Sequence, residues 1–599
     1  MMNHIIHTIS SPKSLIILGI GFIICFFTVP YLLPPEEIVT SMSYDYGFNN
    51  FVGIILVCLS ILVFGFIGYM RNDLELILFE KETEKLSPRY FWYGASVLML
   101  FFFWSSLCGE WILCMPDCSY FLCHIYEMLY GKIPYKDFAF GYGPLTIYLP
   151  YYIYKLIPFI SIINAYIISV ALFHIFGIWC FYEIVNSTNV GKKTKIYLYV
   201  LGYFAFFPFG LGMNYQILRF ILPFWALLRC HQMSTKLRLI YSPLTVVLVL
   251  ALSPEVGLVY LIAMISYCVF LYYVSRSRLY VAILILTLLF SFYFIGAHLP
   301  MFILMQSFGS GFYNFPFIPS FHLIVFFICI FLVAYYVGGA FLQLERFVLE
   351  ISFVLLAFGL LPVCLGRCDP GHVVFNGFFI FYIAIVSLEN KSRYTKNLFC
   401  VLLSFVVVIV FSWNIKVVDV LAPIYNNIDK IYVYRGNLTK SIGNKIEKIY
   451  SLYSKKSSMS PPTPTESCFD AKVAMPIVTI GDRKLYFEAL TNGKLQNLFF
   501  SFTTSLGTSN VNKTVEELKE KKPVYILSRL EMDNYVKPVP YERYNFYIHS
   551  LFHSYFSLKP YRNGNIVNKP LVDYIMQNYE MVNYNKSYIV YKIKKSHSL

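Results

Sequence analysis

The chain has 599 residues, of which 58% are hydrophobic and only 14% are charged, and its mean hydropathy is +0.60. This composition excludes a soluble globular protein and is typical of a polytopic membrane protein. The formal net charge is +15, but the basic residues are spread over many connections instead of forming one stripe, so we expect no nucleic-acid partner.

Apolar runs long enough to form spanning helices recur from about residue 14 to about residue 415. We predict about thirteen spans. They lie at roughly 14–33, 51–70, 91–114, 160–185, 195–213, 215–229, 239–253, 255–275, 278–298, 321–342, 348–365, 372–388 and 397–415. No small-residue cleavage site follows the first run, so it is predicted to be an uncleaved signal anchor.

Connections that are rich in lysine and arginine alternate along the chain with connections that contain few of them. The basic connections are 71–89, 192–195, 229–238, 276–278, the one around Arg346, and 391–396. Those between them contain few basic residues, and basic connections stay in the cytoplasm. We therefore predict a cytoplasmic N-terminus, with the segment 115–159, the turn 366–372 and the C-terminal region on the outer side.

The segment 115–159 is polar and rich in Gly and Pro, although apolar runs flank it. Irregular backbone exposed to lipid would leave amide groups without hydrogen-bond partners, so we predict a structured cap at one face of the membrane. Asp117 follows a span directly, and a functional role is favoured over that of a helix cap. Asp137 lies in an aromatic turn and is a second candidate acid, or a satisfied turn residue. His124 and Glu127 are expected to share a surface helix with Asp117 and to be structural.

Ionisable residues in or beside spans are costly and are by default functional or mutually paired. Arg219 lies one turn inside an apolar run near the predicted outer face, and Glu255 starts another run. A structural Arg219–Glu255 pair is as plausible as a functional role. Arg367, Asp369 and His372 crowd into one predicted outer turn, which favours anion binding.

After residue 416 the composition becomes polar, and no spanning run follows. The segment 457–467 (SSMSPPTPTES) is predicted to be a flexible linker. Candidate strands lie at 473–480, 485–488, 524–528 and 588–593, with helices at 513–521 and 570–579. The predicted fold is thus an α-helical polytopic membrane protein with a small extracytoplasmic α/β domain, divided into 1–90 (two helices and a cytoplasmic loop), 91–415 (the catalytic membrane domain) and 416–599.

Two blocks of the cap, 129–138 (LYGKIPYKDF) and 142–145 (YGPL), together with the preceding Pro116-Asp117, resemble the first large outer loop of GT-C superfamily glycosyltransferases. These include bacterial dolichyl-phosphate-mannose-type mannosyltransferases and aminoarabinose transferases. The turn 366–372 (GRCDPGH) is similar to a second block of bacterial members, and 253–257 (SPEVG) and 219–223 (RFILP) are weaker matches. The resemblance covers about residues 91–390. Two additional spans precede the loop, and no second acid lies directly beside Asp117.

The resemblance implies an inverting transfer of a sugar from a polyprenyl-phosphate donor to a glycan, lipid or protein acceptor outside the membrane. It places the general base at Asp117, with Asp137 as the second catalytic candidate. Because the leaving group is a lipid phosphate, cations are required, and Arg219, Arg367 and His372 could supply them. The supporting residues would be Glu255, Asp369, Lys132 and Tyr142. No metal site is predicted, although a divalent metal requirement is left open.

Two other classes share many of these features. A lipid-linked glycan polymerase or ligase also has many spans and outward arginines, but it usually lacks the two cap blocks. A lipid-glycan transporter or flippase would need ionisable groups near the bilayer midplane. The richness in Lys, Asn, Ile, Tyr and Phe suggests an AT-biased bacterial genome, so we expect a multi-pass protein of the plasma (inner) membrane, in contact with membrane lipids.

Overall fold

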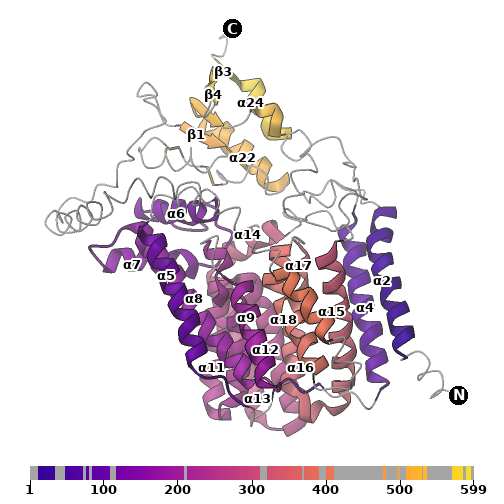
Figure 1. Cartoon of the computed structure of the whole chain (residues 1–599). Helices are drawn as coiled ribbons and strands as arrows, with labels where there is room; N and C mark the ends of the chain where they lie inside the picture. The colour runs from indigo at the N-terminus through magenta and orange to yellow at the C-terminus, as the bar shows by residue number, and fades with distance from the viewer. Residues whose placement is uncertain are drawn as a thin grey trace, which may run out of the picture.

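The protein folds into a helical bundle with a smaller α/β domain at one end (Figure 1). This architecture comes from a computed structural model. The residues it describes are 11–33, 48–71, 76–79, 84–107, 116–207, 212–309, 320–366, 370–389, 399–410, 477–480, 495–496, 498–499, 508–528, 531–535, 569–584 and 589–594.

Every predicted apolar run contains a helix. The bundle helices are α2 (Pro12–Leu32), α4 (Asn50–Tyr69), α5 (Arg89–Leu107), α8 (Ile162–Ser187), α9 (Lys192–Ala205), α10 (Ile217–Gln232), α11 (Thr235–Leu252), α12 (Pro254–Ser275), α13 (Arg278–Ala297), α15 (Phe321–Ala340), α16 (Leu344–Gly359), α17 (Leu361–Gly366), α18 (Pro370–Glu389) and a shorter helix, Phe399–Val410. Within the described ranges, eight helical stretches are long and apolar enough to cross a membrane, with 321–366 counted as one. The helical membrane class is thereby supported, whereas the number thirteen stays a prediction. The helix α14 (Leu299–Gly309) was not predicted.

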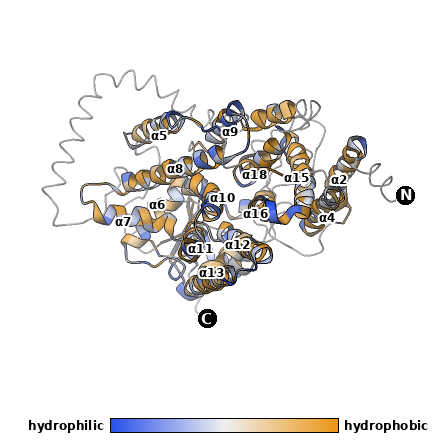
Figure 2. Cartoon of the chain, turned by 90° about the horizontal axis from the view of Figure 1, so that it is seen from below, coloured by the Kyte–Doolittle hydropathy of each residue, from blue (hydrophilic) through white to orange (hydrophobic). Residues whose placement is uncertain are grey.

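Burial separates inner from outer helices. In the most apolar stretch of α18, 94% of the residues are buried, whereas in the corresponding stretches of α2 and α13 only 17% are. In water such exposed apolar faces would be unfavourable, so these helices are suited to contact with lipid. The view along the bundle in Figure 2 places α10 among its neighbours, and it contacts α8, α11, α12 and α16.

The N-terminal helices are held to the bundle by contact between backbones. A side chain added at Gly338 of α15 would come within 1.9 Å of the Gly65 carbonyl oxygen of α4, and one added at Gly68 would come equally close to the Tyr335 carbonyl oxygen. In lipid, helices associate by close packing without a hydrophobic driving force, so small residues at the crossing allow α4 and α15 to approach.

The predicted cap is present. It consists of α6 (Pro116–Leu129), a turn region, and α7 (Leu145–Leu156), and α6 lies across the end of the bundle (Figure 1). Two positive φ angles, at Gly131 (82°) and Tyr135 (66°), shape the turn. For a tyrosine this left-handed conformation is uncommon and is retained only where surrounding contacts fix it.

The C-terminal domain is a four-stranded sheet in the order β1 (Ile477–Ile480), β2 (Tyr525–Ser528), β4 (Ile589–Ile593), β3 (Tyr579–Tyr584), with α22 (Thr508–Lys521) and α24 (Lys569–Asn578). Strands β1 and β2 are parallel, and the other pairs are antiparallel. The small α/β domain is therefore present as predicted, whereas its position outside the membrane stays a prediction. Strand β3 was missed: the predicted helix 570–579 ends where β3 begins, and no element was predicted directly after it. The candidate strand 485–488 and the linker 457–467 lie outside the described residues.

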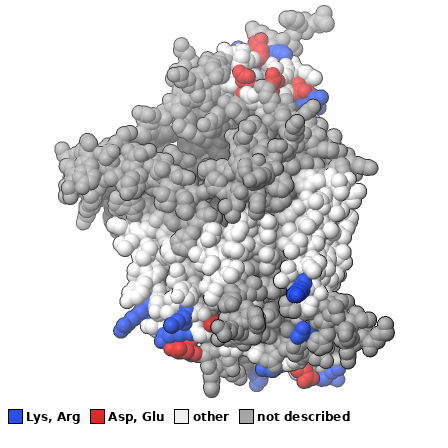
Figure 3. All heavy atoms as spheres, turned by 45° about the vertical axis from the view of Figure 1, so that its right-hand side comes forward, with Lys and Arg blue, Asp and Glu red and all other residues white. Residues whose placement is uncertain are grey.

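Charge divides the bundle along its length. Lys192, Arg229, Arg238 and Arg276 belong to helix ends at the end opposite α6. On the face drawn in Figure 3, charged side chains lie near the lower end of the bundle and on the C-terminal domain, and white surface lies above the lower group. This pattern fits a membrane around the middle of the bundle, with the predicted cytoplasmic connections at one end and the cap at the other.

Candidate functional site

The cap is seated on the bundle through its Tyr-Gly-Pro turn. An added Cβ at Gly143 would lie 2.3 Å from the Ala251 carbonyl oxygen and 2.6 Å from the backbone of Leu252, so only glycine allows this approach to the end of α11. The Thr146 hydroxyl donates to the Gly143 carbonyl oxygen at 2.7 Å, and α7 begins at Leu145. The turn is thus fixed against the end of α11, just before α12 begins.

Aromatic hydroxyl groups hold the turn from the cap side. The Tyr135 hydroxyl donates to the Tyr142 carbonyl oxygen at 2.6 Å, and the Gly141 amide donates to the Tyr120 hydroxyl oxygen at 3.1 Å. Burial raises the pKa of Tyr135 well above its ordinary value, and the nearby Tyr120, Tyr148 and Glu255 raise it further. Tyr135 therefore remains a hydrogen-bond donor at physiological pH.

Arg219 lies beneath Tyr142, with its guanidinium carbon 5.5 Å from the centre of the ring. Its Nε donates to the Ser253 hydroxyl oxygen at 3.0 Å, and Nη1 donates to the Asn214 carbonyl oxygen at 2.7 Å. Its Nη2 donates to Glu255, with which it forms an ion pair. The Arg219 side chain is 12% exposed and that of Glu255 is 21% exposed. The pairing of these two residues, one of the two alternatives from the sequence, is the one observed.

The position of Arg219 in its helix is electrostatically unfavourable. It is the third residue of α10, where the helix dipole favours anions and disfavours cations. Glu255, in the first turn of α12, offsets this cost. The hydrogen bonds above use three of the five guanidinium N–H groups. Two N–H groups therefore remain for a further acceptor.

Two buried amide groups beside Arg219 have no hydrogen-bond partner among the described residues. They are Oδ1 of Asn214, which is 6% exposed, and Nε2 of Gln216, which is 0% exposed. The other end of the Gln216 amide is used, because its Oε1 accepts from the Arg219 backbone amide at 3.2 Å. A buried polar group without a partner is costly, so both groups favour a polar ligand at this place.

His372 joins the edge of this site. It is the third residue of α18, and its ring lies 5.9 Å from that of Tyr215, in the short helix η2 (Met213–Tyr215) that precedes α10. Its carbonyl oxygen accepts from the Asn376 side-chain amide at 3.2 Å. The start of α18 is therefore beside the short helix that precedes α10, while the starts of α10 and α12 are joined by Arg219 and Glu255.

The remaining predicted residues lie elsewhere or cannot be placed. Asp117 is the second residue of α6, but its side chain is outside the described residues, as are Arg367 and Asp369. Asp137 closes its own turn, because its Oδ2 accepts from the Ile133 amide at 2.8 Å. Lys132 reaches the buried Glu127, with Nζ 3.3 Å from Oε1.

His124 and Glu127 lie on α6 as predicted. Nδ1 of His124 is 2.8 Å from Oε2 of Glu127, both side chains are buried, and the imidazole stacks on Phe138. This pair connects α6 to the turn region and fits the structural role expected from the sequence. Among the described residues, no three His, Cys, Asp or Glu side chains are grouped so that they could hold a metal ion.

Four contributors to the site were missed: Asn214, Gln216, Ser253 and Tyr135. A usable signal existed for the first two, because they are polar side chains in a short connection between apolar runs. Ser253 was noted only as part of a sequence block. Nothing in the sequence indicated that Tyr135 adopts a positive φ and supports Tyr142. No protein-family model matches this sequence, and no curated protein is significantly similar to it.

Proposed function

We propose that this protein is a membrane glycosyltransferase that moves a sugar from a polyprenyl-phosphate donor to an acceptor at the cap side of the membrane. The observation that carries the proposal is Arg219, a cation held at a helix start beside unpartnered buried amide groups. A phosphate would accept from the two remaining guanidinium N–H groups and from Nε2 of Gln216. It would also interact favourably with the neighbouring starts of α10 and α12.

The Arg219–Glu255 ion pair is compatible with this proposal. A largely buried guanidinium needs a counter-charge, and Glu255 provides it. The guanidinium can contact the carboxylate and a phosphate at the same time, because its N–H groups point in several directions. Positive charge at the phosphate stabilises the leaving group, which is already a good anion and requires no general acid.

Asp117 is proposed as the general base. It begins the helix that lies across the end of the bundle, and in this role its carboxylate accepts the proton of the acceptor hydroxyl as the oxygen attacks the anomeric carbon. The anomeric C–O bond to the lipid phosphate breaks in the same step, so the anomeric centre is inverted. Tyr142 covers Arg219 from the cap and limits access of water to the phosphate.

The test is direct. Purified full-length protein in lipid nanodiscs is incubated with polyprenyl-phosphate sugars that carry labelled sugar and labelled lipid, with a cell-envelope extract as the source of acceptor, and free lipid phosphate is measured. We expect donor turnover by the wild type and a several-fold weaker use of donor by Arg219→Lys, which keeps the charge but loses the fork. In sealed proteoliposomes, movement of an intact donor across the bilayer without turnover would support a flippase instead.

A further inference from the structure

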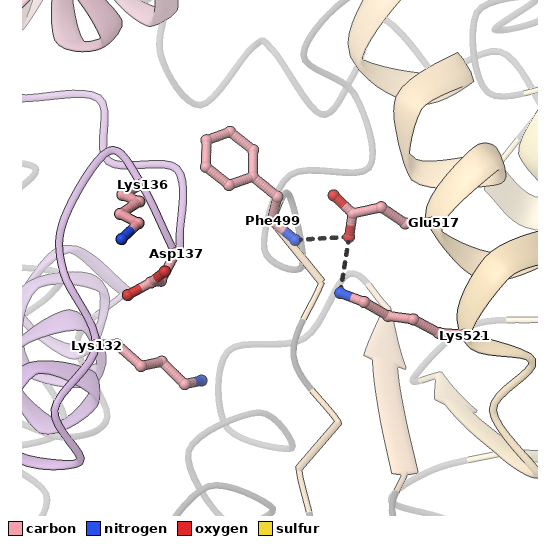
Figure 4. A pocket seen from close by; sticks show the side chains of 6 residues that line it. All are labelled: Lys132, Lys136, Asp137, Phe499, Glu517 and Lys521. Carbon is pink, nitrogen blue, oxygen red and sulfur yellow. Dashed lines mark hydrogen bonds and ion pairs between the residues drawn. The ribbon is translucent and has the colours of Figure 1, made fainter.

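A cavity of about 420 Å³ lies where the cap meets the C-terminal domain. The cap contributes Lys132, Lys136 and Asp137, and the C-terminal domain contributes Phe499, Glu517 and Lys521 (Figure 4). The two sides are joined directly, because the Ala139 amide donates to the Phe499 carbonyl oxygen at 2.9 Å.

An apolar contact fixes the same junction. Ala139 and Leu304 are buried together, with Tyr135 and Phe499 packed against them. Leu304 belongs to α14, so cap, bundle and C-terminal domain meet here. Among the described residues, the cavity is lined by the cap and the C-terminal domain, and α14 supports the junction between them.

The described lining residues carry three amino groups and two carboxylates, and one of the amino groups, that of Lys132, is also paired with Glu127. Both carboxylates already have donors. Glu517 Oε2 accepts from the Phe499 amide at 3.0 Å and lies 3.3 Å from Lys521 Nζ, and Asp137 accepts from its own turn. No described acid lies within ion-pair distance of the exposed Lys136 amino group. An anion bound in the cavity would give Lys136 a counter-charge and would add to the acid partners of Lys132 and Lys521.

The turn that contains Tyr135, Lys136 and Asp137 contributes both to the cavity and to the surroundings of Arg219. Lys136 and Asp137 face the cavity, whereas Tyr135, the residue before them, donates to Tyr142 beside Arg219. A group transfer between two substrates needs one site for each, close to a common reacting atom. The cavity is thus well placed for the second substrate.

We propose that this cavity binds the acceptor, and that the acceptor is a saccharide carrying a carboxylate or phosphate substituent. This inference rests on the proposed transferase function. The lysines would bind the anionic substituent, the two carboxylates would accept sugar hydroxyl groups, and Phe499 would pack against the apolar face of a sugar ring.

Binding to full-length protein in nanodiscs is measured by calorimetry without donor, so that it does not depend on turnover. The probes are a galacturonic acid tetrasaccharide and its carboxyl-reduced counterpart. We expect the acidic probe to bind more tightly, and Lys136→Gln or Lys521→Gln to weaken it by about fivefold. The matched control is Lys155→Gln, at an exposed cap lysine in the last turn of α7 outside the cavity, and we expect it to have no effect.

Several outcomes would overturn the proposal. They are equal binding of the two probes, no loss with either cavity variant, an equal loss with Lys155→Gln, and displacement of the acidic probe by equimolar inorganic phosphate. Failure of the proposed transferase function can be distinguished from failure of the cavity proposal. Charge-dependent saccharide binding without donor turnover would leave the cavity assignment and remove the enzyme, whereas donor turnover with unaltered binding in the lysine variants would do the reverse.

Discussion

The two ends of helix α10 each carry an arginine paired with a glutamate, and the pairs differ. Arg229, in the last turn, uses Nε at 2.9 Å and Nη2 to bind Glu183, while Nη1 donates to Gln232 at 3.2 Å. Trp225 also donates to Glu183, at 2.6 Å. There the helix dipole favours a cation. Arg219, in the first turn, has the dipole against it and unpartnered amide groups beside it.

This difference separates a structural pair from a functional candidate. The Arg229 pair has the helix dipole in its favour and lies at the basic end of the bundle, so stabilisation of the fold is sufficient to explain it. The Arg219 pair places a cation where the helix dipole disfavours it. Such an energetic cost is expected where a bound ligand completes the interactions. The ion pair alone would not have distinguished the two ends.

The largest expected effect is a difference in labelling by a reagent that cannot cross the membrane. The comparison requires the two ends of α10 to face different compartments. In a cysteine-free background, Asp117→Cys and Leu530→Cys should react with an impermeant thiol reagent from outside intact cells. Lys236→Cys, at the basic end, should react only after the membrane is opened. Labelling of all three from the same side would break the comparison.

Next in size is the loss of the proposed base at the functional end. Asp117→Asn keeps the shape of the side chain but removes the proton acceptor, so donor turnover should fall by about 100-fold or more. Thermal unfolding should be unchanged. A mild effect here together with a severe effect of Asp137→Asn would reverse the roles of the two acids.

Displacing the cap tests whether the seating of Tyr142 over Arg219 matters. Gly143→Ala places a methyl group 2.3 Å from the Ala251 carbonyl oxygen, so the turn must move. We expect turnover to fall by about 10- to 100-fold, because small displacements of substrate-positioning groups are costly. Gly131→Asn, which tolerates the positive φ and meets open space, is the control. Equal turnover in both variants and the wild type would contradict a role for the seating.

Arg219→Ala and Arg229→Ala provide the matched pair for the comparison itself. The first should weaken donor binding by about tenfold, the value of one charge-assisted hydrogen bond. The second should lower thermal stability and leave donor affinity unchanged. Donor affinity is measured by equilibrium binding on folded protein. If both variants lose only stability, Arg219 is as structural as Arg229.

The smallest effect is expected at Tyr135. Because its pKa is raised, its hydroxyl stays protonated and donates to Tyr142 across the physiological range and beyond pH 9. Tyr135→Phe should cost about 1 kcal/mol of unfolding free energy and leave the shape of the pH–activity profile unchanged between pH 7 and 9. A basic limb that is present in the wild type and lost in the variant would show that the hydroxyl ionises in this range.

The sequence predicted what depends on composition and local pattern. Apolar runs located the helices, and the Gly- and Pro-rich segment located the cap, since both follow from the cost of unpaired backbone in lipid. Arg219 and Glu255 stood out because charges are rare in such runs. Their pairing stayed one of two alternatives, because hydrophobicity indicates that a helix spans but not which of its faces meets which neighbour.

Other features depend on contacts distant in sequence. The buried amide groups of Asn214 and Gln216 became informative only once their surroundings were known. Strand β3 was missed because no Gly or Pro separates it from α24, and the residues after the predicted helix 570–579 were assigned to no element. The cavity could not be predicted at all, since Lys136 and Lys521 come from domains that the sequence treats separately.

The hydrogen bond between Ala139 and Phe499 has a consequence for the order in which the molecule is made. A chain synthesised from its N-terminus inserts its cap long before the C-terminal domain emerges and folds. The cavity can therefore close only at the last stage of biogenesis, after the whole bundle has been threaded and the final domain has reached the same side. A nascent or truncated chain would possess the Arg219 site but no complete place for a second substrate, so that maturation of the molecule and competence for transfer would coincide.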